Sequence, residues 1–112
     1  TLQASCLAES VDTSKQAVVD VIYTCNNAGL VTVTLPDTAA VGSTIGFVGK
    51  GAGKFKIAQN AGETIYAIDQ TTTAGVTGSL TAVEQYASIY IVCTTADVAW
   101  TASSIVGNFT VA

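Results

Sequence analysis

The segment from Leu30 to Ile65 constrains the fold more than any other part of this chain, because short β-patterned runs follow one another there with no helical interruption. Residues 31–35 alternate valine or leucine with threonine, so that one face of an extended segment is apolar and the other carries hydroxyl groups. Pro36 ends this strand because proline donates no hydrogen bond to a sheet, and the glycines at 42, 49, 51 and 53 then allow tight reversals. The segment predicts a β-meander or a close variant of one.

The rest of the chain continues this pattern and predicts an all-β fold of about eight short antiparallel strands. Runs of β-branched and aromatic residues recur roughly every ten residues, which is typical of a small sandwich or a barrel-like domain. The Asn-Ala-Gly turns at 27–29 and 60–62 favour two hairpins, which join 17–25 to 30–35 and 55–58 to 64–68, although two similar turns do not make an internal repeat. Further strands are expected at 88–94, 98–102 and 105–111. Residues 70–79 predict the longest loop, and residues 80–86 predict an irregular segment or a short helical turn.

Length and composition predict one domain that associates with other chains. We expect residues 17–112 to form the β domain and residues 1–16 to be a polar lead-in from a longer protein. Hydrophobic residues make up 49% of the chain and charged residues only 11%, which is well below the usual value of about a quarter. With so few charges, part of the uncharged surface is expected to pack against another chain. The alternative is a compact monomer whose threonine and serine side chains supply the polar surface.

Charge and hydropathy argue against two classes of partner. Four lysines, no arginine and eight acidic residues give a net charge of −4, whereas nucleic-acid binding needs a basic surface. The longest strictly apolar run, residues 89–93, is far too short to cross a membrane as a helix. We therefore expect neither nucleic-acid binding nor membrane insertion.

The cysteines and the lack of histidine argue against a metal, another cofactor or catalysis. Cys6, Cys25 and Cys93 are far apart and lack metal-ligand spacing. We expect them to be free thiols that act as small hydrophobic side chains, with a Cys25–Cys93 disulfide as the alternative. Without histidine the chain also lacks the commonest general base and the usual nucleophile pairs, so we expect it not to be an enzyme.

Candidate binding residues lie where the strand pattern breaks. Asp69 precedes the 70–79 loop, and Glu84, Gln85 and Tyr86 follow one another in the second irregular segment. An acid, an amide and an aromatic ring are groups suited to a sugar, so Asp69, Gln85 and Tyr86 are the predicted ligand-binding residues. Asp69 and Glu84 are also the carboxylate pair that glycoside hydrolysis would need, but the interpretation as solvated turn acids is favoured because nothing in the sequence shows that they share a cleft.

The order of these runs resembles a β-rich domain found at the C-termini of bacteriophage tail fibres and tailspikes. The resemblance covers the chain from about Tyr23 to the end and is carried by LVTVTLP, VGSTIGFVGKGAGKFKIAQNAGETI, GVTGSL, IYIVCTTADVAW and SIVGNFTVA. Where that family has Gly-Gly-Trp-Lys, this chain has Gly53-Lys54-Phe55-Lys56, which keeps an aromatic residue.

The resemblance implies a homotrimer at the tip of a tail fibre in the virion, assembled in the cytoplasm of the bacterial host. Its function would be noncovalent binding of a bacterial cell-surface glycan, strengthened when three sites engage at once. Residues 1–16 would then come from the longer fibre protein. Two alternatives are a purely structural trimerisation cap and a non-catalytic fragment of a polysaccharide depolymerase tailspike.

Overall fold

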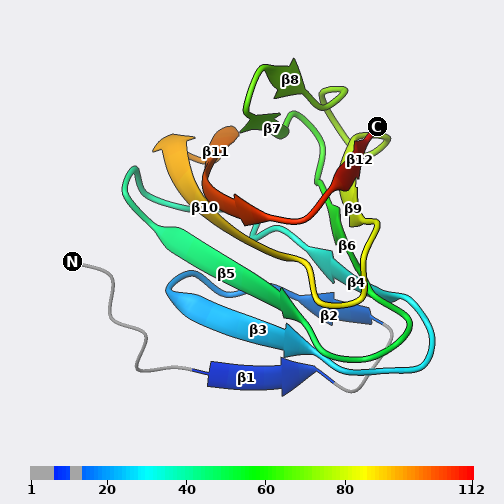
Figure 1. The fold of residues 1–112 in the computed structure, drawn as a ribbon. Helices are drawn as coiled ribbons and strands as arrows, with labels where there is room; N and C mark the ends of the chain where they lie inside the picture. Colours follow the sequence, from blue (N-terminus) through cyan, green and yellow to red (C-terminus); the bar gives the residue numbers. More distant parts are fainter. Residues whose placement is uncertain (1–6, 11–13) are drawn as a thin grey trace.

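Two facing β-sheets make up the structure, a computed structural model that describes residues 7–10 and 14–112 (Figure 1). The larger sheet has seven strands, in the order β1 (Leu7–Ser10), β3 (Val21–Cys25), β5 (Thr44–Gly49), β10 (Ser88–Thr95), β11 (Ala99–Val106), β7 (Thr64–Ala67) and β8 (Gln70–Thr71). The smaller sheet has five, in the order β12 (Phe109–Val111), β9 (Ser79–Ala82), β6 (Phe55–Ala58), β4 (Val31–Thr34) and β2 (Ser14–Gln16). The described residues contain no helix. The prediction of an all-β, sandwich-like fold is therefore confirmed.

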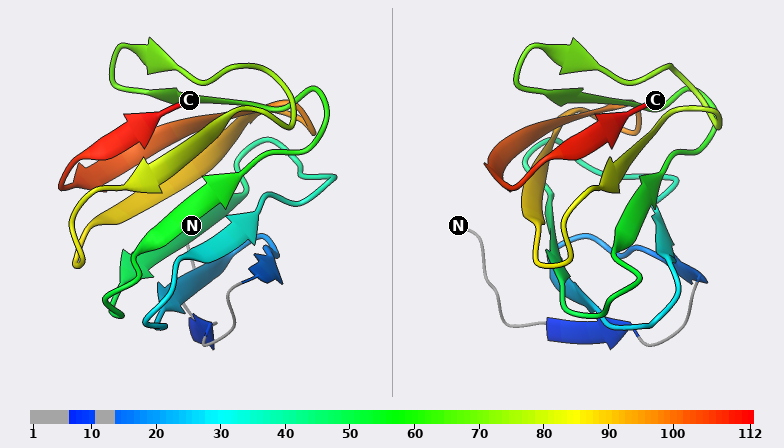
Figure 2. Two further views of the ribbon diagram at one scale, coloured as in Figure 1. Left: turned by 90° about the vertical axis from the view of Figure 1, so that its right-hand side faces the viewer. Right: turned by 45° about the vertical axis from the view of Figure 1, so that its right-hand side comes forward.

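The first six strands wind as a parallel coil, because consecutive strands alternate between the two sheets (Figure 2). β1, β3 and β5 are parallel neighbours in the larger sheet, and β2, β4 and β6 are parallel neighbours in the smaller one. Val21 pairs with Ile45 in the larger sheet and Val31 pairs with Phe55 in the smaller sheet, so from β3 to β5 and from β4 to β6 both sheets advance by the same number of residues. The chain thus circles the core before its C-terminal half closes the sandwich.

This coil corrects the expectation of antiparallel hairpins. Of the ten strand pairings in the described residues, five are parallel and five are antiparallel. The turn at 27–29 joins β3 to β4 and the turn at 60–62 joins β6 to β7, and each of these pairs is split between the two sheets. The physical reason is that a glycine turn reverses or bends the chain without specifying which neighbour the next strand will meet.

Stacked backbone at the coil corner explains the Gly51-Ala52-Gly53 motif. The N–H of Gly51 donates to the carbonyl oxygen of Cys25 at 3.0 Å, and the N–H of Gly53 donates to that of Asn27 at 2.9 Å. A Cβ atom on Gly53 would lie 1.9 Å from the carbonyl oxygen of Gly29. Only glycine therefore lets one corner lie directly on the next.

Four aromatic rings connect the coil to the end of the chain inside the core. Successive ring centroids are 6.2 Å apart for Tyr23 and Phe47, 6.0 Å for Phe47 and Phe55, and 5.8 Å for Phe55 and Phe109. Each such pair adds about 0.5–1.5 kcal/mol beyond the area it buries. The row therefore ties β3, β5 and β6 to β12.

The C-terminal half departs from the predicted pattern at several points. Strand β8 lies in the predicted 70–79 loop, and β11 runs through the predicted gap between 102 and 105. Residues 79–82, which include the end of the predicted 70–79 loop and the start of the predicted irregular segment 80–86, form strand β9 because Leu80 and Ala82 face the core. The single strand expected at 105–111 is interrupted at Gly107, whose φ of +93° turns the chain from β11 into β12. This turn brings β12 to the edge of the smaller sheet.

Two strands lie within residues 1–16, the segment interpreted as a lead-in. β1 runs parallel to β3, and β2 runs parallel to β4. Each adds an edge strand to its sheet.

Cys25 and Cys93 are buried free thiols, in agreement with the prediction for these two residues, and Cys6 lies outside the described residues. Burial raises the pKa of Cys25 to about 11. The Cys25 thiol is therefore kept in its neutral form and fills the core as a small apolar group.

Candidate functional site

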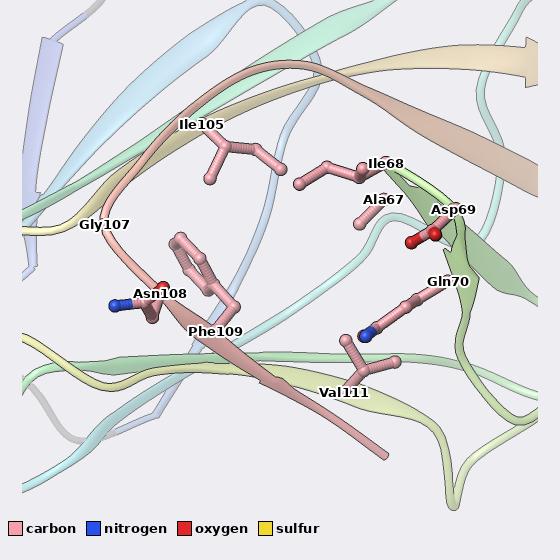
Figure 3. Close-up of a pocket in the computed structure, with 9 residues that line it drawn as sticks. All are labelled: Ala67, Ile68, Asp69, Gln70, Ile105, Gly107, Asn108, Phe109 and Val111. Carbon is pink, nitrogen blue, oxygen red and sulfur yellow. The ribbon is translucent and has the colours of Figure 1, made fainter.

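A pocket of about 180 Å³ opens between the β7–β8 hairpin and the β11–β12 turn (Figure 3). β8 is an edge strand of the larger sheet and β12 is an edge strand of the smaller sheet. The pocket therefore lies between one edge of each sheet. Its lining residues are Ala67, Ile68, Asp69, Gln70, Ile105, Gly107, Asn108, Phe109 and Val111. The two walls thus come from chain segments separated by about a third of the sequence, and only the fold brings them together.

The turn that forms one wall contains an unusual backbone conformation. Ile68 and Asp69 are the two residues between β7 and β8, and Ile68 has a φ of +57°. A positive φ at the first turn residue alone is a feature of type II′ hairpins, in which glycine is the favoured residue. A β-branched residue in this region stores roughly 1–3 kcal/mol of strain, a feature that clusters at binding sites. The Ile68 side chain is nevertheless 89% exposed.

The polar groups of the pocket come mainly from the same wall. Figure 3 shows the Asp69 carboxylate and the Gln70 amide projecting into the pocket beside Ile68. Within the described residues neither side chain makes a hydrogen bond or an ion pair. Ile105, Phe109 and Val111 face them with apolar surface. The pocket therefore offers unpaired polar groups on one side and a largely hydrophobic wall on the other.

Glu84 fixes the rim of the pocket through Asn108. The backbone N–H of Asn108 donates to Oε1 of Glu84 at 2.7 Å, and Nδ2 of Asn108 donates to Oε2 at 3.1 Å. These two bonds, backbone first, lower the pKa of Glu84, and the charge of Lys54 adds to the effect. Gly107 fits tightly beside them, since a Cβ atom there would lie 2.9 Å from Oε1 of Glu84. The β9–β10 loop is therefore attached to the β11–β12 turn.

Of the predicted binding residues, the structure places one in the pocket and two on the neighbouring loop. Asp69 lines the pocket, whereas Gln85 and Tyr86 follow Glu84 in the β9–β10 loop and do not line it. Nε2 of Gln85 donates to the carbonyl oxygen of Lys50 at 3.1 Å, which fixes this loop to the coil corner. The Tyr86 side chain is 71% exposed, an exposure compatible with ligand contact.

Sequence reasoning did not find the remaining lining residues. The sequence pattern places Gln70 at the start of the predicted 70–79 loop, and it places Asn108 and Phe109 inside the predicted strand 105–111. The glycine at 107, inside an apolar run, was the available signal that a turn stands there. Ile68 carried no signal, because its positive φ follows from the two-residue length of the turn and not from its residue type.

The described residues contain no group of three or more histidine, cysteine or acidic side chains that could hold a metal ion. Nor does any helix in that part of the chain have the length and hydropathy needed to cross a membrane. Comparison of the chain with models of protein families gives no match, and neither does comparison with curated proteins.

Proposed function

We propose that this chain is the distal domain of a phage tail fibre, which assembles as a homotrimer and binds a bacterial cell-surface glycan. The observation that carries the binding part is the pocket between β7–β8 and β11–β12, in which Asp69 and Gln70 face Phe109 and Ile105. Residues predicted from the sequence and residues supplied by the fold contribute to it together.

The size and lining of the pocket support a sugar as the ligand. A cavity of about 150 Å³ holds one benzene ring, so 180 Å³ accommodates a single six-membered ring. A sugar ring presents C–H groups on its faces and hydroxyl groups around its edge. The wall of Phe109 and Ile105 suits the former, and the carboxylate and amide of Asp69 and Gln70 suit the latter. Tyr86, which is exposed on the β9–β10 loop, is the candidate contact for a further unit of a glycan.

The state of Glu84 supports binding over hydrolysis by the pair Asp69 and Glu84. Glycoside hydrolysis needs one carboxyl group with a raised pKa to protonate the leaving oxygen. The pKa of Glu84 is shifted in the opposite direction, and both of its oxygens are engaged with Asn108. Glu84 is therefore a structural anchor of the rim, and the proposed function is not enzymatic.

An uncharged sheet surface supports assembly. The adjacent strands β3, β5, β10 and β11 contain no charged residue. On the outer surface of these strands the side chains of Ile22 and Tyr90 pack over Gly46. A Cβ atom on Gly46 would lie 3.0 Å from an atom of each side chain. Copies that each carry a net charge of −4 repel one another least where they meet on such a surface. The same observation favours the second candidate, a purely structural trimerisation cap, if the pocket binds nothing.

Light scattering and a glycan array test the proposal together. The expected mass is three times the 11.3 kDa of one chain, and a clean monomer would contradict the assembly. Asp69→Ala and Tyr86→Ala should each weaken binding to the glycan by about 1 kcal/mol or more without changing the mass. Asp37→Ala is the matched control, because Asp37 is exposed and does not line the pocket. A trimer that binds no glycan on the array would replace the receptor-binding proposal with the structural cap.

A further inference from the structure

We infer that the pocket between β7–β8 and β11–β12 selects a sugar ring that carries a free amino group, and disfavours acidic sugars. This inference rests on the proposed function, because it names the class of glycan unit that the same pocket would bind. The inference follows from the charge of the lining residues and from the difference in hydrogen bonding between the carboxylates of Asp69 and Glu84.

Asp69 gives the pocket a negative charge that nothing in its lining balances. It is the one ionisable side chain among the nine lining residues, and none of the nine is a lysine. The chain has no arginine and a net charge of −4, so the electrostatic potential of the whole chain is negative, like the charge of Asp69. A ligand ammonium group is therefore attracted, whereas a carboxylate or phosphate group is repelled.

The contrast between Asp69 and Glu84 shows which carboxylate is available to a ligand. Both oxygens of Glu84 accept hydrogen bonds from Asn108, and the charge of Lys54 acts on the same carboxylate. Asp69 makes no hydrogen bond or ion pair within the described residues, and its carboxylate points into the pocket in Figure 3. Asp69 can therefore accept a charge-assisted hydrogen bond without first losing a partner.

The arrangement of the polar and apolar walls fixes where the amino group would lie. Asp69 and Gln70 are consecutive residues on one wall, so an amino group beside a hydroxyl group on one edge of a ring meets an acceptor and an amide together. The ring face then lies toward Phe109 and Ile105 on the other side. An acetylated amino group has no positive charge and needs added room, and both properties reduce its fit in 180 Å³.

NMR titration of the whole chain with four monosaccharides at pH 6 tests this inference. The probes are glucosamine, glucose, N-acetylglucosamine and glucuronate, and the signals followed are the backbone amides of residues 67–70 and 107–111. We expect glucosamine to bind about threefold to fivefold more tightly than glucose, because Asp69 is exposed and water screens its interaction with an ammonium group. Glucuronate should bind most weakly.

Asp69→Asn keeps the shape of the side chain and removes its charge. This variant should bind glucosamine and glucose equally, while Asp37→Asn, which removes the same charge elsewhere on the surface, should keep the preference. Binding of glucuronate or N-acetylglucosamine as tight as that of glucosamine would overturn the inference and leave the proposed glycan binding intact. If no probe shifts the pocket signals and the glycan array is also empty, the proposed function fails and the inference fails with it.

Discussion

Replacing Ile68 with glycine should stabilise the fold and weaken ligand binding. The residue has a φ of +57°, a conformation that stores roughly 1–3 kcal/mol of strain in a β-branched residue. Its side chain is 89% exposed, so little buried area is lost when it is removed. Against the relief of strain stands the larger backbone entropy of glycine in the unfolded chain, about 0.5–1 kcal/mol. The net gain for Ile68→Gly is therefore about 1 kcal/mol, or a rise in Tm of about 4 °C for a chain of this size.

Thermal unfolding followed by circular dichroism measures the change in stability, and a glycan-binding assay measures the change in affinity. Val76→Gly is the matched control, because Val76 is also β-branched and 71% exposed but has no positive φ. The control should lose about 0.5–1 kcal/mol from backbone entropy alone. Equal losses in the two variants would show that the backbone at Ile68 is not strained. Unchanged glycan binding in Ile68→Gly would show that the side chain is not a wall of the site.

Three further predictions concern the coil and the core. Gly53→Ala should cost about 2–3 kcal/mol in urea denaturation because its Cβ would meet the backbone of Gly29 at 1.9 Å. Gly62→Ala, with open space but a φ of +80°, should cost only about 1 kcal/mol, and equal costs would contradict the stacked corner. Burial raises the pKa of Glu63, so the wild type should gain stability as the pH falls from neutral through that pKa. Glu63→Gln should lack this gain, and parallel pH profiles of the two proteins would refute the assignment. Because the pKa of Cys25 is about 11, iodoacetamide should not modify this thiol in the native protein at pH 8, and stability should fall between pH 9 and pH 11.

The strands were largely predictable from the sequence, whereas their partners were not. The strand at 55–58 has its predicted bounds, and the alternation at 31–34 places valines inside and threonines outside as expected. A local pattern of period two reports which side chains are buried and says nothing of which strand lies next to it. The predicted hairpins at 27–29 and 60–62 failed for this reason.

A signal for the coil was nevertheless present, in a different pair of turns. Tyr23 aligns with Phe47, and Gly29 aligns with Gly53, when residues 21–31 are placed over 45–55. The structure puts these aligned residues side by side in register. The turns at 27–29 and 60–62 have the same sequence, Asn-Ala-Gly, but they are not stacked on each other in the structure. Comparing 27–29 with 51–53 would have indicated one coil stacked on another.

The candidate site was predictable only in part, because its two walls lie far apart in the sequence. Asp69 could be singled out as an acid where the strand pattern breaks. The apolar wall could not, because Phe109 becomes part of a pocket only when the turn at Gly107 places β12 opposite the β7–β8 hairpin. Gln85 and Tyr86 were selected by the same reasoning as Asp69, and the fold places them on the loop that supports the rim.

The strain at Ile68 can persist because a buried polar network fixes both strands of the hairpin that carries it. The backbone N–H of Ile65 donates to the Thr72 hydroxyl at 2.9 Å, and that hydroxyl donates to Oε1 of Gln59. Nε2 of Gln59 also donates to the carbonyl oxygens of residues 63, 73 and 75, at 2.7, 2.9 and 2.9 Å. A two-residue turn between strands held in this way has no freedom to relax its first residue toward a negative φ. The coil supplies Gln59, Gln59 fixes the hairpin, and the hairpin holds Asp69 at the pocket before any ligand arrives, which lowers the ordering cost of binding.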